Sequence, residues 1–120
     1  MAIELRTKYG QIDISNDVIA MIAGGAAMDC YGIVGMASKK QIKDGLTEIL
    51  RRENFARGVI VRQEEDQVFI DMYIIVSYGT KISEVANNVQ SKVKYTLDQT
   101  VGLSVDAVNI FVQGVRVTNP

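Results

Sequence analysis

The sequence predicts one α+β domain in which helices pack on a mainly antiparallel sheet. The stretch from Val68 to Gly79 alternates apolar with mixed positions, is rich in β-branched and aromatic residues and contains no proline. Side chains on a strand alternate between its faces, so this stretch indicates a long central strand with one apolar face. Residues 81–100 have a helical apolar period, and the segments follow the order β-α-α-β-β-α-β over residues 1–120.

The composition limits the class and location of the protein. The chain has 120 residues, 48% of them hydrophobic and 22% charged, with a net charge of −1. These are ordinary globular values, and they give no general attraction to nucleic acid or anionic membranes. The single cysteine cannot form an intramolecular disulfide, the N-terminus lacks the apolar run of a signal peptide, and no window is apolar enough to span a membrane. We expect a single cytosolic domain.

The first third of the chain predicts two short strands and a helix. Residues 1–9 indicate a short strand or an ordered arm, and residues 10–14 alternate as a strand. Ser15 can cap the helix that follows. Its apolar face consists of Ile19, Ile22, Ala23, Ala26 and Cys30. Gly24 and Gly25 each cost about 1 kcal/mol relative to alanine in mid-helix, so we expect them to allow close approach to the sheet or to a partner.

The middle third predicts a loop, a second helix and a hairpin. Residues 31–40 indicate the loop, because Gly32 and Gly35 interrupt them, and residues 41–54 have the apolar stripe of a helix. Gly58 ends that segment. Residues 59–62 alternate as a strand, which the polar residues 64–67 connect to the central strand.

The last third predicts a helix and a closing strand. Thr80 can cap a helix over residues 81–100, and Gly102 stands at the position where glycine ends helices. Residues 105–117 alternate as a strand. Beyond Gly114 the apolar residues move from even to odd positions, which indicates a bulge.

The residues give no support for catalysis. The chain contains no histidine, which removes the commonest general base and metal ligand. Cys30 lies on an apolar helix face, as a core thiol does, and no phosphate-binding, dinucleotide-binding or Gly-x-Ser-x-Gly motif occurs. The acidic run at residues 64–66 is typical of a solvated hairpin end. We therefore predict a protein that is not an enzyme, with no catalytic residue, cofactor or metal site.

The mixed face of the central strand is the first candidate for a binding surface. Its members, with neighbours from adjacent strands, are Phe69, Asp71, Tyr73, Ile75, Ile60 and Phe111. If no helix covers this face, these side chains form an exposed patch of the kind that marks protein contacts. The alternative is that helices cover both faces and that the same side chains belong to the core.

Basic residues between positions 39 and 62 form the second candidate. They are Lys39, Lys40, Lys43, Arg51, Arg52, Arg57 and Arg62. They could meet an acidic partner, nucleic acid or lipid head groups, or they could simply form a solvated helix face. Gly32 and Gly35 precede them in a Gly-x-x-Gly pattern between two predicted helices, as in KH domains. The alternative function is therefore KH-like binding of single-stranded nucleic acid, although no basic residue stands between the two glycines.

Several short motifs in a fixed order carry a family resemblance. They include Gly-x-Ile-x-Ile-Ser at residues 10–15, Tyr-Gly-Ile-Val-Gly-Met at 31–36, Val-x-Tyr-Gly at 76–79 and Thr-Val-Gly-Leu at 100–103. With the segments between them, the chain from residue 10 to 117 resembles the alkaline shock protein / general stress protein family of Gram-positive bacteria. The lack of a long basic or Gln/Lys-rich tail is similar to its short housekeeping branch.

The resemblance implies a non-catalytic role in envelope stress and cell-envelope homeostasis, and it transfers no active-site residue. It also implies partners. Some members of the family self-associate and are held at the cytoplasmic side of the membrane by a membrane-anchored relative. Short members are often encoded beside a dihydroxyacetone-kinase-like fatty acid kinase, which implies a link to membrane-lipid homeostasis. We therefore predict an interaction or scaffold protein that forms homo-oligomers or docks on such a partner.

Overall fold

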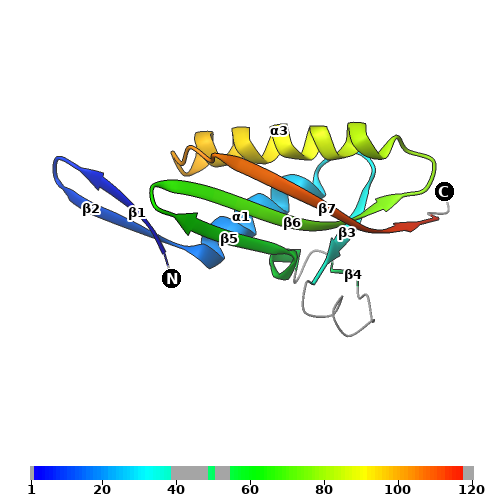
Figure 1. Ribbon diagram of the computed structural model, residues 1–120, viewed down its shortest axis with the longest axis horizontal. Helices are drawn as coiled ribbons and strands as arrows, with labels where there is room; N and C mark the ends of the chain where they lie inside the picture. The colour runs from blue at the N-terminus through cyan, green and yellow to red at the C-terminus, as the bar shows by residue number, and fades with distance from the viewer. Residues whose placement is uncertain (1, 39–48, 51–54, 118–120) are drawn as a thin grey trace.

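A computed structural model describes residues 2–38, 49–50 and 55–117 of the chain. Two helices pack on one face of a five-stranded sheet, and a separate two-stranded hairpin projects from one end (Figure 1). Within the sheet, three of the four strand pairings are antiparallel and one is parallel. The predicted α+β class and the mainly antiparallel sheet are confirmed.

The projecting hairpin consists of β1 (Ala2–Thr7) and β2 (Gly10–Ser15), which pair only with each other among the described strands. Ile3 lies opposite Ile14, and Leu5 lies opposite Ile12. Ile3 is buried in the core, whereas Ile12, nearer the tip, is 50% exposed. The predicted strand at residues 10–14 is therefore confirmed, but it does not join the main sheet.

Helix α1 (Asn16–Met28) begins as predicted, because the Ser15 hydroxyl accepts a hydrogen bond of 3.2 Å from the Asp17 amide. A Cβ at Gly24 would lie 2.8 Å from a ring carbon of Phe55, which belongs to the short 3-10 helix η1 (Phe55–Gly58). Only glycine allows this contact without displacing the ring. The expectation that the mid-helix glycines permit close approach is confirmed at Gly24.

The central strand is β6 (Gln67–Ser77), as predicted. On one edge, β5 (Val59–Glu64) pairs with residues 67–72 and β3 (Ile33–Ala37) pairs with residues 74–76, both antiparallel. On the other edge, β7 (Ala107–Arg116) runs parallel to β6 along nearly its whole length. The two-residue strand β4 (Ile49–Leu50) pairs with β3 at the margin of the sheet.

Helix α3 (Ile82–Thr100) makes the parallel pairing of β6 with β7 possible. Parallel strands need a crossover, and a helix of 19 residues spans about 28 Å, enough to carry the chain back along most of β6. Gly102 ends the helix with φ +78°, and the Leu103 amide bonds back to the Leu97 carbonyl, as predicted for a C-terminal glycine.

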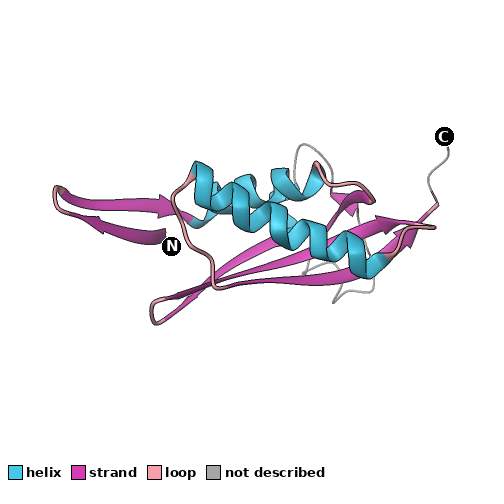
Figure 2. Cartoon of the chain, turned by 90° about the horizontal axis from the view of Figure 1, so that it is seen from above, coloured by secondary structure: helices cyan, strands magenta, loops and turns pink. Residues whose placement is uncertain are grey.

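The core lies between the helices and the even-numbered residues of β6. Helix α1 contributes alanines and Ile19, whereas α3 contributes valines and Leu97, all almost inaccessible to solvent. Small residues on α1 let the two helices lie side by side over one face of the sheet (Figure 2). The buried strand residues that meet them are Val68, Ile70, Met72, Ile74 and Val76.

Three predictions about local structure are wrong. Residues 33–37 form β3 instead of a loop, because Gly32 adopts φ +90° as a turn and the following residues pair with β6. Ile49 and Leu50 form a strand within the predicted second helix, whose other residues, 41–48 and 51–54, lie outside the described ranges. Thr80 does not cap α3: Lys81 occupies that position without a side-chain bond, and the Thr80 hydroxyl donates to the Ser77 carbonyl.

Two features of the sheet agree with the sequence. The predicted hairpin between β5 and β6 is confirmed, and it turns through Glu65 and Asp66. Glu65 adopts φ +58°, a backbone conformation that glutamate as a residue type does not predict. The register of β7 against β6 shifts between Ile74 and Ile75, which brings Ile75 opposite Gly114. The predicted bulge near Gly114 is confirmed.

Candidate functional site

The face of the sheet opposite α1 and α3 is the candidate site, and we call it the open face. Both described helices pack against the even-numbered side of β6, so no described helix lies over the odd-numbered side (Figure 2). Of the two arrangements that the sequence allowed, the described structure therefore has helices on one face only. The open face presents residues from β5, β6 and β7 in one continuous surface.

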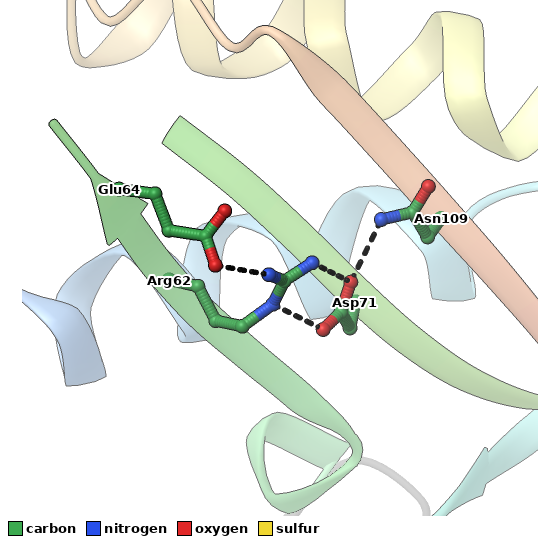
Figure 3. Close-up of polar contacts among 4 residues, drawn as sticks. All are labelled: Arg62, Glu64, Asp71 and Asn109. Atoms are coloured by element: carbon green, nitrogen blue, oxygen red, sulfur yellow. Dashed lines mark hydrogen bonds and ion pairs between the residues drawn. The ribbon is translucent and has the colours of Figure 1, made fainter. Parts of the chain in front are cut away.

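A polar network crosses the three strands at the middle of this face (Figure 3). Arg62 on β5 forms two hydrogen bonds with Asp71 on β6, of 2.7 Å from Nε and 3.1 Å from Nη2. Asn109 on β7 donates to the same carboxylate at 2.9 Å, and Nη1 of Arg62 lies 3.3 Å from Glu64. Asn109 lies directly opposite Asp71, whereas Arg62 lies diagonally and reaches it with a long side chain.

The network keeps a carboxylate on the sheet with little access to water. The side chain of Asp71 is 12% exposed and that of Arg62 is 39% exposed. The hydrogen bond to Asp71 raises the pKa of Arg62 above its ordinary value, so the guanidinium stays charged at every accessible pH. Because the fork of Arg62 and the amide of Asn109 both bind Asp71, the network fixes the relative positions of β5, β6 and β7.

Aromatic side chains flank this network on the open face. Tyr73 and Phe111 lie in register on β6 and β7, with ring centroids 4.9 Å apart and an angle of 17° between the rings. The guanidinium carbon of Arg62 lies 5.0 Å from the centre of the Phe69 ring. Phe111 is 40% exposed, and the other two rings are half-buried. We call Arg62, Phe69, Tyr73 and Phe111 the aromatic–arginine patch.

Ile75 does not belong to this surface. It was predicted as an interaction residue because it shares the odd-numbered side of β6, yet it is 0% exposed. Ile60 is half-buried and lies opposite Asp71, so it borders the network. Asp71 is also buried, so its role is to hold Arg62 in place more than to contact a partner directly.

Sequence reasoning missed how Arg62, Asn109 and Glu64 are connected. The spacing of basic residues groups Arg62 with the basic segment, and the alternation of the last strand places Asn109 on its surface. The signal that could have found the network is Asp71 itself, a charged residue in the middle of an otherwise apolar strand. A carboxylate in such a position needs hydrogen-bond donors on the adjacent strands.

The Gly-x-x-Gly pattern does not form a loop between helices. Gly32 is a turn residue, and a Cβ there would lie 2.7 Å from Cγ2 of Val85, so its role is close packing against α3. Gly35 pairs with Ile75 inside the sheet. The KH-like arrangement predicted for these two glycines is therefore wrong, because the backbone that would meet phosphate is part of a β-ladder.

The predicted basic segment is mostly outside the described residues. Lys39, Lys40, Lys43, Arg51 and Arg52 all fall there. Of the remaining two, Arg57 lies exposed in η1, and Arg62 is paired with Asp71 and Glu64 on the open face. The predicted surface for an anionic partner therefore stays a prediction.

Cys30 lies just after α1, partly buried, and its thiol is directed to the Ala26 carbonyl at 3.5 Å. Burial raises the pKa of the thiol; Lys92 opposes this effect and Asp29 adds to it. A raised pKa keeps the sulfur protonated at neutral pH and unreactive, as expected for a packing residue. Among the residues that the structure describes, no group of three or more potential ligands could hold a metal ion.

Comparison with known proteins identifies the family. Residues 4–117 match the model of the alkaline shock protein family, which is described as having a "cell envelope-related function". The chain belongs to this family. The predicted resemblance to alkaline shock proteins is confirmed, and a cell envelope-related function follows from it. No solved structure matches the chain.

Two relatives match this alkaline shock family protein over all or nearly all of its length. It is 83% identical over 120 residues to the uncharacterised protein YloU of Bacillus subtilis, covering all of both chains. It is 46% identical over 117 residues to the uncharacterised protein Spy1614 of Streptococcus pyogenes, covering 98% of this chain and 97% of that one. In the described part of this family member, neither helix is long and apolar enough to cross a membrane.

Tyr73 provides a titratable reporter of the open face. Its pKa is raised, mainly because burial disfavours the phenolate; the Asp71 carboxylate adds to the rise and Arg62 opposes it. We expect the ultraviolet titration of the wild type, minus that of Tyr73→Phe, to give one phenol that ionises above the ordinary value of about 10.

The raised pKa also has a stability consequence. The folded state holds the Tyr73 proton more tightly than the unfolded chain, so this contribution is complete below about pH 10 and is lost as pH rises through the folded pKa. Wild type should therefore lose stability relative to Tyr73→Phe as the pH is raised from about 9 to about 11 in urea unfolding. A constant difference across that range would place the phenol in a fully solvated environment instead.

Proposed function

We propose that this protein is a non-catalytic scaffold in cell-envelope homeostasis that self-associates through its open face. The observation that carries the proposal is the partly exposed aromatic–arginine patch on the side of the sheet that neither described helix covers. Tyrosine and arginine are enriched at the residues that dominate binding energy in protein interfaces, and aromatic side chains are generally enriched there. A rigid strand backbone holds these side chains in place.

The charges of the patch support a second copy of the chain as its partner. Arg62 is the cation of the patch, and its guanidinium is already neutralised by Asp71 and Glu64. Two identical patches can therefore face each other without strong like-charge repulsion. Such a contact is isologous, with each open face packed on the other at about 10 Å, as in sheet-on-sheet packing.

Light scattering behind size exclusion, over a wide dilution series, tests self-association directly. We expect wild type to form a dimer or larger species that resists dilution. Tyr73→Asp places a charge on the ring stack, and Phe69→Ser removes the ring beneath Arg62, so both variants are expected to be monomeric. Tyr9→Asp is the matched control: Tyr9 lies in the turn between β1 and β2, is 89% exposed and should leave the assembly unchanged.

Circular dichroism distinguishes loss of assembly from loss of fold. Monomeric variants with a wild-type spectrum support the open face as the contact surface. A wild type that stays monomeric at every concentration contradicts self-association. Unfolding of both Tyr73→Asp and Phe69→Ser would instead assign these rings a structural role and contradict the proposed interface.

The partners implied by the resemblance stay predictions. They are a membrane-anchored relative, which would hold the protein at the cytoplasmic side of the membrane, and a dihydroxyacetone-kinase-like fatty acid kinase. Surface plasmon resonance with each purified candidate tests them. Loss of binding with Tyr73→Asp, but not with Tyr9→Asp, would indicate that the partner uses the open face.

A further inference from the structure

The outer edge of β5 is a second surface, distinct from the open face. β5 lies below β6 in Figure 1 and pairs with it along one side, and no described strand pairs with its other side. β3 shares the β5 side of β6, and there the Ser77 amide bonds to the Gly32 carbonyl at 2.8 Å. On the β7 side, the Asp106 amide bonds to the Val68 carbonyl at 2.9 Å. The odd-numbered residues of β6 therefore direct their backbone groups toward β5.

The free edge of β5 presents backbone groups at alternate residues. Opposite residues of an antiparallel pair either exchange both backbone hydrogen bonds or exchange none. Ile60 and Arg62 lie opposite odd-numbered residues of β6, so their backbone groups are bonded to that strand. Val61 and Gln63 alternate with them and direct their N–H and C=O groups outward. Among the described residues, no backbone group outside the ladder bonds to Val61 or Gln63, so another strand can pair with them.

A hollow of about 350 Å³ lies beside this edge on the helix side. Its apolar lining consists of Ala20 and Met21 of α1, Ala56 of η1, and Val59 and Val61 of β5. Met21 is 61% exposed, so the lining is accessible from outside. Residues that lie opposite each other on adjacent strands share a face of the sheet. A strand added to this edge would therefore direct alternate side chains toward the hollow.

The two ends of the hollow carry opposite charges. η1 carries Arg57 and packs against Gly24, in the second half of α1. Asn16 and Asp17 line the hollow from the first turn of the same helix. Arg57 and Asp17 are both exposed, and neither forms an ion pair with a described residue. Both charges are therefore available to an occupant of the hollow.

The end beside Asn16 and Asp17 favours a basic side chain. The Oδ1 atom of Asn16 is buried and has no hydrogen-bond partner among the described residues, so a donor near it is favourable. The Asp17 carboxylate carries a full negative charge, which exceeds the positive charge of about half a unit at a helix N-terminus. The end beside Arg57 favours an acidic side chain, because the guanidinium there is a cation without a partner.

We propose that this groove binds an extended segment of a partner protein that pairs with the outer edge of β5. The segment carries a basic, an apolar and an acidic side chain at alternate positions. In a segment antiparallel to β5, the basic side chain comes first and lies beside Asp17, the apolar one lies over Ala20 and Val59, and the acidic one lies beside Arg57. Main-chain hydrogen bonds supply affinity, and the hollow supplies specificity, as in other cases of strand addition.

A second copy of the chain does not supply such a segment. None of the described strands places a basic, an apolar and an acidic residue at alternate positions in this order, in either direction. Pairing of two β5 edges about Val61 is two-fold symmetric, so it would also bring the first turn of a second α1 to the hollow. Two Asp17 carboxylates would then meet at one site. The groove therefore favours a foreign segment.

The probe is a synthetic heptapeptide with blocked ends, Thr-Lys-Thr-Leu-Thr-Glu-Thr. Added in excess to the ¹⁵N-labelled full chain, it should shift the amide signals of Val61 and Gln63 and slow their hydrogen exchange about tenfold, because these amides gain acceptors. The amides of Ile60 and Arg62 are the control in the same strand, and their exchange should change much less. Two matched peptides, one N-methylated along its backbone and one with serine in place of leucine, should bind about tenfold more weakly.

A charge exchange tests the role of Arg57. Arg57→Glu should weaken binding of the probe about fivefold, and it should bind a peptide with lysine in place of glutamate about fivefold more tightly than wild type does. Arg6→Glu changes an exposed arginine on β1, outside the hollow, and should leave both affinities unchanged. Tyr73→Asp should also bind the probe as wild type does, because the open face is a separate surface.

Three results would overturn the proposal. They are equal binding of the N-methylated peptide, unchanged signals at Val61 and Gln63, and an affinity that does not respond to Arg57→Glu. Protection of the same two amides in the free protein that rises with concentration would overturn it as well, because a second copy would then occupy the edge.

Discussion

Replacing Gly32 by alanine is expected to lower the free energy of unfolding by about 3 kcal/mol. Two effects add at this position. Gly32 has φ +90°, where a side chain costs about 1–2 kcal/mol. In addition, the new Cβ would lie 2.7 Å from Cγ2 of Val85, which is buried on α3 and has little room to move. Urea unfolding followed by circular dichroism measures the loss.

Gly79→Ala is the matched control for this prediction. Gly79 has nearly the same φ, +93°, but nothing lies within 4 Å of a Cβ built there. Gly79→Ala should therefore lower the free energy of unfolding only by the cost of a side chain at positive φ, about 1 kcal/mol. The difference between the two variants measures the packing between the turn at Gly32 and α3. If both variants lose the same free energy of unfolding, the close contact with Val85 is contradicted. Glycine would then be required at position 32 only for its positive φ.

Arg62→Met is expected to destabilise the protein by about 2 kcal/mol, more than Asp71→Leu does. Removal of the arginine takes two charge-assisted hydrogen bonds away from a carboxylate that is only 12% exposed. Removal of the aspartate leaves an arginine that is 39% exposed, which water and Glu64 can still solvate. The loss of stability therefore depends on which of the two partners is deleted.

The double variant Arg62→Met/Asp71→Leu completes this experiment. Replacing a buried ion pair with apolar side chains of similar volume is often neutral or stabilising, so the double variant should be more stable than Arg62→Met alone. Urea unfolding at neutral pH gives all three differences. A larger loss for Asp71→Leu than for Arg62→Met, or additive losses in the double variant, would show that the two side chains do not act as a pair.

The sequence predicted those elements whose side chains repeat in a regular period. The central strand and α3 alternate or repeat cleanly, because each buries one side against the same core. β3 was missed because Gly32 and Gly35 resemble loop residues, although one makes the turn and the other lies in the ladder. Residues 33–37 form a strand because they pair with β6, and the local residue preferences of a segment cannot predict a partner that lies far away in the sequence.

The candidate site was predictable in its location but not in its connections. Residue alternation alone indicates that Phe69, Tyr73 and Phe111 share the mixed face of the sheet. Burial of Ile75 and the bond between Arg62 and Asp71 depend on register across three strands. A shift of one residue in that register would move every one of these side chains to the opposite face. The surface is therefore a property of strand pairing more than of any single segment.

The parallel pairing of β7 also sets the order in which the open face can form. β5 and β6 form a hairpin between neighbouring segments, whereas β7 joins only after the whole of α3 has been made and folded back. Asn109 and Phe111, which complete the network and the ring stack, both arrive with β7. A chain that has not yet added β7 therefore lacks two parts of the open face, the amide that bridges to Asp71 and the outer ring of the aromatic stack.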